Sequence, residues 1–351
     1  MNISFYTYLT EDEKFGGSQL RNKAVLKIFK ALGHEVKITY RTKNQSHPSI
    51  LTYLKGLLYG LNTRTLFNTA HSTLAESDYI HFDNLQFFNW TFNRPLPPII
   101  FNTHDLQFEN FGGRDNSSKP HRLIKYELQK MRQSHLVFVC STREKNLICQ
   151  HALDLEDKIF VLPNLVDGDN FCPPTDIQKD TISFIGTLGY FPNQEAIKFL
   201  CNSFMPSLTN ETKSKYRFVI AGRGPLDGQK ELAEKAGFEF MTDLTSEELS
   251  NLLHRTKVSL VPLSHGSGTR LKILEAVFSK ALVLSTPLGT EGIESNLVTV
   301  ASLSEFASRL ENLLQSEPIQ EKKALESFYQ EFDTMSWFAN NKSKLIEKLK
   351  T

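Results

Sequence analysis

The segment Val258–Ala276 holds the densest set of residues that could do chemistry. An apolar run leads into a loop of glycine and serine, and a helical pattern that opens with Arg270 and Lys272 follows the loop. Free backbone N–H groups and the positive end of the helix dipole attract anions at such a turn. Two cations at the same place are repelled by the positive end of the dipole, and a bound phosphate would compensate for this repulsion. The segment indicates a phosphate site, with an ordinary turn bearing two solvated cations as the alternative.

Glu275 lies three residues after Lys272, so both side chains leave the predicted helix on nearly the same face. A carboxylate at that place could accept hydrogen bonds from the two neighbouring hydroxyls of a ribose. A surface ion pair between the two side chains, worth ~0.2–0.5 kcal/mol, is the alternative. Another polar loop, Thr286–Gly292, follows the next apolar run of the chain.

Short β-rich runs that alternate with amphipathic stretches must position these residues. The first series of predicted strands is Ile3–Tyr6, Val36–Tyr40, Tyr79–Phe82, Ile99–Thr103, Leu136–Cys140 and Ile159–Leu162. The second series is Ile182–Ile185, Phe218–Ala221, Phe238–Met241, Val258–Val261, Leu282–Ser285 and Val298–Val300. Such alternation predicts an α/β chain with two doubly wound parallel sheets. Ligands of such sheets bind at the carboxyl ends of the strands, which is where the polar loops lie.

Length, charge and cysteine content narrow the class of protein. A chain of 351 residues corresponds to two domains at ~150 residues each. The net charge of +1 argues against nucleic-acid binding through the charge of the whole surface. The four cysteines have no metal-ligand spacing, and no run reaches the ~18 apolar residues of a membrane span. The N-terminal residues lack the basic segment of a signal peptide, so we expect a cytoplasmic protein.

Several stretches, in order, resemble the retaining glycosyltransferases of family four, also called glycosyl transferases group 1. The similar stretches are Pro262–Ala276 with Glu291-Gly292-Ile293, Gly16-Gly17-Ser18 with Gly33-His34-Glu35-Val36, Val161–Asp167, Phe184–Asn193, and Val219–Pro225. Together they span most of the chain. Each stretch is weakly specific alone, and their order and spacing carry the resemblance.

The resemblance implies a GT-B fold, in which two Rossmann-like domains with parallel sheets face each other across a cleft. Residues 1–168 would bind the acceptor, residues 169–335 would bind the nucleotide sugar, and a terminal helix at 336–351 would pack back on the N-terminal domain. The implied reaction moves a sugar, with retention, from a UDP- or GDP-sugar to a glycan, lipid-linked or other glycoconjugate acceptor. Surface polysaccharide assembly is the implied setting. No metal or other cofactor is implied.

The resemblance also assigns roles to residues. Glu275 matches the second glutamate of the family's Glu-x7-Glu motif and would bind ribose, whereas Ser267 replaces the first glutamate. Arg270 and Lys272 would bind the diphosphate, since Leu188–Asn193 lacks the family's usual cation. His104 would face the reacting sugar, with a loop histidine bound to backbone as the alternative. The other residues implied in donor binding are Gly17, Gly186, Thr187, Asn193, Arg223, His265, Gly266, Ser267, Gly268 and Thr269.

Two other functions remain open. One is a catalytically silent subunit that binds nucleotide sugars, which Ser267 keeps open. The other is a GT-B nucleotide-sugar epimerase, which would need carboxylates around the donor sugar, and Ser267 argues against it. A nicotinamide dehydrogenase is disfavoured because no G-x-G-x-x-G follows the first predicted strand. The two aspartates at Asp167–Asp169 lie in the predicted linker, so we do not predict a metal site there.

Three further segments concern the acceptor and the chain end. The helical repeat of leucines at Ile50–Leu61 predicts either a buried helix or one that contacts the inner face of a membrane. Glu109–His121 is predicted as a loop, either an acceptor loop or a surface connection. Near the C-terminus, a mixed-charge helix is predicted at Lys344–Lys350.

Overall fold

The computed structural model describes residues 1–7, 17–40, 77–85, 96–112, 119–174, 177–265, 270–315 and 322–350. The chain forms two compact units. Unit 1 includes Gly17–Asn164 and Phe338–Thr351, and unit 2 includes Leu165–Trp337. Among the described residues, no helix has the length and apolar character needed to cross a membrane.

Unit 1 is built on a parallel sheet of six strands in the order β2-β1-β3-β4-β5-β6. The strands are β1 (Asn2–Thr7), β2 (Glu35–Tyr40), β3 (Tyr79–Asp83), β4 (Ile99–Asn102), β5 (Leu136–Val139) and β6 (Ile159–Val161). Each lies within two residues of its predicted range. The strand order reverses at β1, so the ends of β1 and β3 flank the place where doubly wound sheets bind ligands.

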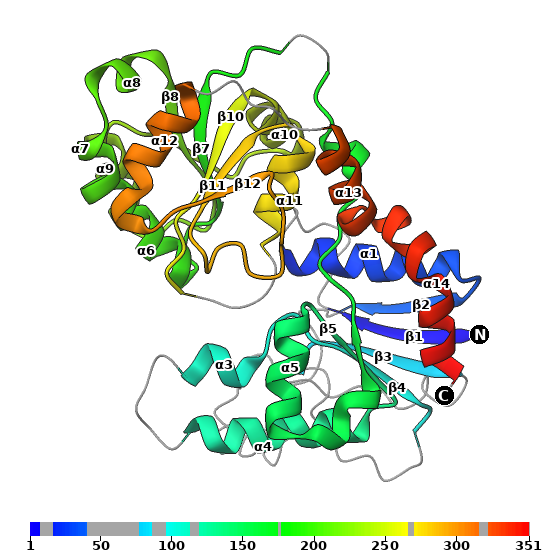
Figure 1. The fold of residues 1–351 in the computed structure, drawn as a ribbon. Helices are drawn as coiled ribbons and strands as arrows, with labels where there is room; N and C mark the ends of the chain where they lie inside the picture. The colour runs from blue at the N-terminus through cyan, green and yellow to red at the C-terminus, as the bar shows by residue number, and fades with distance from the viewer. Residues whose placement is uncertain are drawn as a thin grey trace. The chain divides into compact units, whose positions relative to one another are not determined.

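Helices pack on both faces of this sheet (Figure 1). They are α1 (Gly17–Ala31), α3 (Gln107–Gly112), α4 (Lys119–Gln133), α5 (Thr142–His151) and α14 (Thr334–Lys350), of which Phe338 onward belongs to unit 1. A core of buried aliphatic and aromatic side chains from the strands, α4 and α5 joins helices to sheet. Gly33 ends the first helical segment with a φ of 80°, a backbone conformation that favours glycine.

Two predictions about helices need correction, and one lies outside the described residues. The predicted loop Glu109–His121 is wrong at both ends, because α3 continues to Gly112 and α4 begins at Lys119. The C-terminal helix begins ten residues before Lys344, at Thr334, because the Asp333 carboxylate accepts hydrogen bonds from the backbone N–H of Met335 and Ser336. The predicted helix Ile50–Leu61 lies outside the described residues.

His81 on β3 is fully buried, and neither ring nitrogen has a hydrogen-bond partner among the described residues. Its ring stacks on Phe5 with 3.9 Å between centroids and meets Phe29 edge-on. Burial lowers the pKa of His81 to about 3. The ring is therefore a neutral core group, and its two nitrogens cost free energy that an apolar side chain would not.

We expect His81→Phe and His81→Leu to remove part of the acid sensitivity of folding. In the unfolded chain His81 takes up a proton near its ordinary pKa of 6.5, while in the folded unit it stays neutral down to about 3. Stability therefore falls as the pH drops below 6.5, by about 2 kcal/mol between pH 7 and pH 5. Urea unfolding of both variants and the wild type at the two pH values measures the difference. Equal pH dependence in all three proteins would contradict this role.

Unit 2 contains a second parallel sheet, with the strand order β12-β11-β10-β7-β8-β9. Its strands are β7 (Thr181–Thr187), β8 (Arg217–Arg223), β9 (Glu239–Thr242), β10 (Thr256–Val261), β11 (Leu282–Ser285) and β12 (Val298–Val300). The predicted strands are confirmed within two residues. Here the order reverses between β7 and β10, which makes that pair the switch point of the unit.

The helices of unit 2 also flank their sheet on both sides (Figure 1). They are α6 (Phe191–Phe199), α7 (Met205–Ser207), α8 (Asn210–Lys215), α9 (Gln229–Ala236), α10 (Ser246–Arg255), α11 (Leu271–Phe278) and α12 (Phe306–Gln315). A further helix, α13 (Lys322–Phe332), packs on Phe278 of α11. Helix α10 begins with a capping box between Thr245 and Glu248, which satisfies backbone groups at its start. Helices α6 and α11 each follow a strand of the switch point.

The backbones of β7 and β8 approach each other closely at their carboxyl ends. A Cβ atom placed on Gly222 would lie 1.7 Å from the carbonyl oxygen of Gly186, far inside contact distance. Only glycine fits at position 222. Gly186 and Gly222 therefore allow the ends of β7 and β8 to lie close together next to the loop that leads to α6.

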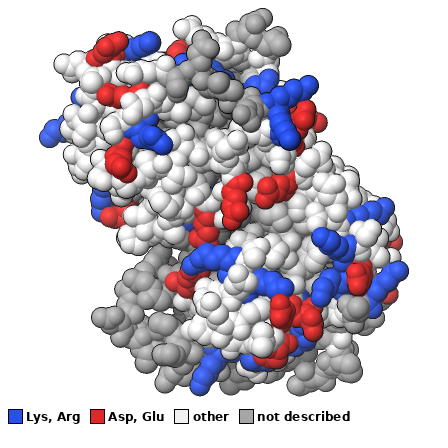
Figure 2. All heavy atoms as spheres, viewed as in Figure 1, with Lys and Arg blue, Asp and Glu red and all other residues white. Residues whose placement is uncertain are grey.

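Acidic and basic side chains are interspersed over the face of the molecule shown in Figure 2. This pattern agrees with the net charge of +1. The charges that bear on chemistry are therefore local ones, at the ends of the strands.

Candidate functional site

Lys272 lies at the switch point of unit 2, in the first turn of α11. Its Nζ donates a hydrogen bond to Oδ1 of Asn193 on α6, at 3.1 Å, and lies 4.4 Å from the centre of the Phe184 ring. A Cβ atom on Gly186 would come within 3.0 Å of the same Nζ. The ammonium is thus held between the ends of β7 and α11 by uncharged groups. No carboxylate of the described residues forms an ion pair with it.

Glu275 stands one turn further along α11, and it too is half-buried. The predicted surface ion pair with Lys272 does not form, and no hydrogen bond to the Glu275 carboxylate occurs among the described residues. Burial, and then the nearby Arg270, lower the pKa of Lys272 to about 7. Burial raises the pKa of Glu275 to about 7, against the opposing charge of Lys272. Opposite charges in a part-buried site, neither in an ion pair among the described residues, suit a ligand that offers both an anion and hydroxyl groups.

Of the other predicted donor residues, Gly186 and Asn193 lie next to Lys272. Gly186 and Thr187 end β7, and Arg223 ends β8. Arg270 directly precedes α11. The loop residues Gly266, Ser267, Gly268 and Thr269 lie outside the described residues.

His265 is exposed at the end of the segment that follows β10. The Oγ of Ser264 and Nδ1 of His265 are 2.9 Å apart, and the ring of His265 meets that of Phe191 at the start of α6, with 5.6 Å between centroids. The start of α6 and the segment after β10 therefore meet at the switch point of unit 2.

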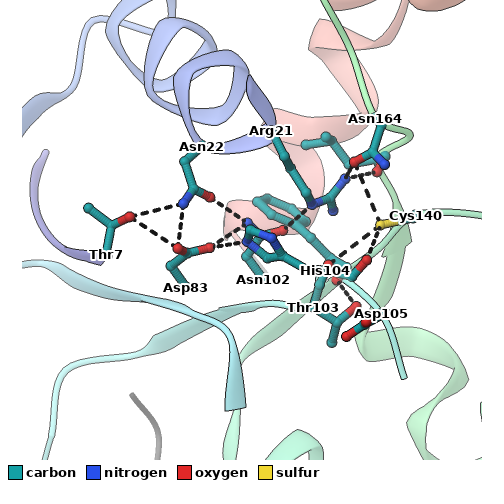
Figure 3. Close-up of polar contacts among 12 residues, drawn as sticks. Thr7, Arg21, Asn22, Asp83, Asn102, Thr103, His104, Asp105, Cys140 and Asn164 are labelled. Atoms are coloured by element: carbon teal, nitrogen blue, oxygen red, sulfur yellow. Dashed lines mark hydrogen bonds and ion pairs between the residues drawn. The ribbon is translucent and has the colours of Figure 1, made fainter. Parts of the chain in front are cut away.

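In unit 1 the buried carboxylate of Asp83 is the centre of a polar cluster (Figure 3). Asp83 ends β3 and accepts hydrogen bonds from Thr7 at the end of β1, at 3.0 Å, and from Nδ2 of Asn22 on α1. It also pairs with Nε2 of His104, which follows β4. Burial alone would raise the pKa of Asp83, but His104 and Asn22 outweigh it and hold the pKa below its usual value.

Arg21 on α1 extends the cluster toward β6. Its Nε donates to Oδ1 of Asn102 at 2.9 Å, and its Nη1 donates to the carbonyl of Leu162 at 2.8 Å and to Asn164 at 3.2 Å. Asn102 in turn approaches Asp83 at 3.4 Å. A buried cation and a buried anion are therefore linked through one asparagine at the switch point of unit 1.

The ring of His104 is held by the side chain of Asp83 and not by a backbone group. This contradicts the alternative of a loop histidine bound to backbone. Its ring retains 13% exposure, whereas Asp83 has none. The carbonyl of His104 accepts from the thiol of Cys140 at 3.3 Å, which fixes the loop after β4. An imidazole oriented by a buried carboxylate can hold one tautomer and present its other edge to a ligand. Gly17, the residue predicted to approach the donor, begins α1.

Sequence reasoning missed Asp83, Arg21 and Asn22. A signal for Asp83 existed, since it directly follows the predicted strand Tyr79–Phe82 at a carboxyl end. The sequence contained no such signal for Arg21 or Asn22, because both occupy what look like ordinary polar positions of an amphipathic helix.

The linker residues Gly168 and Asp169 make structural contacts with the segment Tyr329–Asp333. Asp169 accepts a hydrogen bond from the hydroxyl of Tyr329, and the N–H of Gly168 donates to Asp333 at 3.0 Å. No group of three or more potential metal ligands occurs among the described residues.

Residues 179–316 match the family model of glycosyl transferases group 1. A curated relative, an uncharacterized 44.6 kDa protein in the cps region of Klebsiella pneumoniae, is 26% identical over 128 residues. That match covers 34% of this chain and spans about a third, 32%, of the relative's length.

Three solved structures show the fold of the chain. Sucrose-phosphate synthase from Thermosynechococcus elongatus has a TM-score of 0.74 at 13% identity, over 99% of this chain and 98% of that one. Trehalose-6-phosphate from E. coli bound with UDP-2-fluoro glucose has a TM-score of 0.68 at 13% identity, over 98% and 99%. Anabaena Alr3699/HepE in complex with UDP and glucose has a TM-score of 0.64 at 13% identity, over 99% and 100%. The chain therefore has the GT-B fold, and the family match supports a glycosyltransferase.

Proposed function

We propose that this chain, a GT-B protein with a glycosyl transferases group 1 domain over residues 179–316, transfers a sugar from a nucleoside diphosphate sugar to an acceptor hydroxyl with retention at the anomeric carbon. The donor is a UDP- or GDP-sugar, and the acceptor is a glycan, lipid-linked or other glycoconjugate. Solved neighbours with UDP, or with UDP and glucose, support the donor class.

The observation that carries the proposal is the environment of Lys272. Its ammonium is half-buried at a switch point, and its contacts are an amide oxygen and an aromatic ring. An ammonium removed from water without a counter-ion is costly unless a ligand supplies the charge. A diphosphate at the start of α11 supplies that charge and also meets the positive end of the helix dipole.

Beside the proposed diphosphate site, the Glu275 carboxylate provides a hydrogen-bond acceptor. Three residues, a rise of ~4.5 Å along α11, separate it from Lys272, which is the scale of a ribose beside its phosphate. A carboxylate accepts two hydrogen bonds from a vicinal diol with both of its oxygens. We assign Lys272 to the diphosphate, together with Arg270, and Glu275 to the ribose.

In the proposed reaction, the bond between the anomeric carbon and the diphosphate oxygen breaks, and a bond from the acceptor oxygen forms on the same face of the sugar. The acceptor proton passes to the departing phosphate oxygen, so no separate base is needed. Lys272 and Arg270 stabilise the charge that grows on the leaving group. His104, held by Asp83, contributes a hydrogen bond to the reacting sugar. No step requires a metal.

Nucleoside diphosphate release from a panel of UDP- and GDP-sugars tests the proposal. The wild type should slowly hydrolyse one donor. Glu275→Gln should lower kcat/KM about 10-fold or more, because hydrogen bonds to a charged group are worth about 1.5–3 kcal/mol. Glu247→Gln, an exposed position on α10, is the matched control and should match the wild type.

Two outcomes would contradict transfer. Conversion of one nucleotide sugar into another without release would indicate an epimerase. Binding of nucleotide sugars without turnover, with every glycan and lipid-linked acceptor tried, would indicate a silent binding subunit. Co-sedimentation of the protein with anionic lipid vesicles separately tests peripheral contact with a membrane.

A further inference from the structure

The stretch Leu188–Asn193, from the loop after β7 into the first turn of α6, contains no cation, yet its Asn193 makes a polar contact with the cation of α11. Asn193 lies in the first turn of α6 and is 5% exposed. Its Oδ1 accepts from Lys272 Nζ at 3.1 Å, and its Nδ2 donates to the carbonyl of Thr187 at 2.8 Å. Both ends of the amide are therefore engaged inside the protein.

Gly186 makes this arrangement possible. A Cβ atom at position 186 would lie 2.9 Å from Nδ2 of Asn193 and 3.0 Å from Nζ of Lys272. The absence of a side chain there lets the amide and the ammonium meet over the end of β7. The contact joins α6 to α11 across the β7–β10 switch point, the two helices that follow those strands.

We infer that Asn193 is a positioning residue that acts through Lys272, holding the ammonium at the switch point and favouring its charged form, and does not itself bind the donor. This inference rests on the proposed function, in which Lys272 binds the diphosphate. It revises the role that resemblance gave to Asn193, from a donor contact to a support of the residue that makes the contact.

The electrostatics around Lys272 give the amide this influence. The charged groups that act on Lys272 are Arg270 and Glu275, both from its own segment. The other elements packed on it contribute uncharged groups, namely Phe184 and Gly186 from β7 and Asn193 from α6. An amide oxygen that accepts from an ammonium stabilises the charged form, so its removal should shift the equilibrium toward the neutral amine.

The pH dependence of nucleoside diphosphate binding tests the inference, with UDP and GDP as probes and calorimetry from pH 5.5 to 8.5. Wild-type affinity should fall above about pH 7, where Lys272 loses its proton. Asn193→Ala should move this fall to lower pH by about one unit. Asn193→Asp keeps the shape, places a carboxylate on the ammonium, and should move the fall to higher pH while weakening binding at every pH.

Asn202→Ala, an exposed position beyond α6, is the matched control and should leave the profile unchanged. Shifts of opposite sign in the two Asn193 variants distinguish action through Lys272 from a general loss of structure, which would weaken binding equally at all pH values. If Asn193→Ala does not fold, the direction in which Asn193→Asp shifts the pH profile of binding tests the inference by itself. A folded variant with the wild-type profile would overturn the inference while leaving the function intact. A wild type that binds neither UDP nor GDP at any pH would instead overturn the proposed function.

Discussion

Replacing Lys272 with methionine should lower kcat/KM for the nucleotide sugar by at least about 10²-fold. Removal of one preorganised donor to a developing negative charge costs about that factor in other enzymes. Methionine preserves much of the length of the side chain, so packing over Phe184 should survive and the loss should report charge. Steady-state kinetics and calorimetric binding of the nucleoside diphosphate measure the effect.

The control for Lys272→Met is Lys280→Met. Lys280 is exposed just past the end of α11, so the same change of charge and shape occurs nearby without touching the switch point. Wild-type activity is expected for this control. If Lys272→Met bound the nucleoside diphosphate as tightly as the wild type, the assignment of the phosphate to α11 would be wrong.

The second large effect is expected in unit 1. Asp83→Asn removes the charge that pairs with His104 and sets an amide against the amide of Asn22. Transfer to an acceptor should fall by about 10²-fold or more, since an imidazole without its orienting carboxylate loses most of its contribution. Asp83→Ala should in addition destabilise the protein by about 3–5 kcal/mol, because the partners of a buried charge are left unpaired.

The two units allow this effect to be separated from donor binding. Nucleoside diphosphate affinity of Asp83→Asn should equal that of the wild type, because Lys272 and Glu275 belong to unit 2. Asp157→Asn, at an exposed position of unit 1, should behave as the wild type in transfer and in urea unfolding. Unchanged transfer by a folded Asp83→Asn protein would exclude a role for the Asp83–His104 pair in the reaction.

The predictable part of this fold was the part determined by local pattern. Apolar runs bounded by glycine and polar residues located every strand that the described residues form, and the start of α11 followed from a glycine-rich loop and the apolar face after it. The glycine-serine loop at a strand end pointed to Lys272 as a candidate, because parallel strands gather their carboxyl ends at one edge, whereas His104 was a candidate through the family resemblance.

Which side chain meets which could not be predicted, because it depends on strand order. Asp83 and His104 are 21 residues apart, and Lys272 and Asn193 are 79 apart. The pairs form because β3 lies beside β4 and β7 beside β10, an arrangement that periodicity alone does not specify. The buried Arg21 could not be distinguished from a solvated lysine on the same helix, since both read as polar positions.

The order in which the chain is synthesised has a consequence for unit 1. Residues Leu165–Trp337 of unit 2 form one stretch, whereas unit 1 takes its last helical segment from Phe338 onward. The hydroxyl of Tyr79 donates to the carbonyl of Leu349, a contact that spans 270 positions. Domains tend to fold as they leave the ribosome, and distant contacts form last. Most of unit 2 can therefore be complete while unit 1 still waits for its final helix, and chaperone protection would be needed longest by the half of the protein that emerges first.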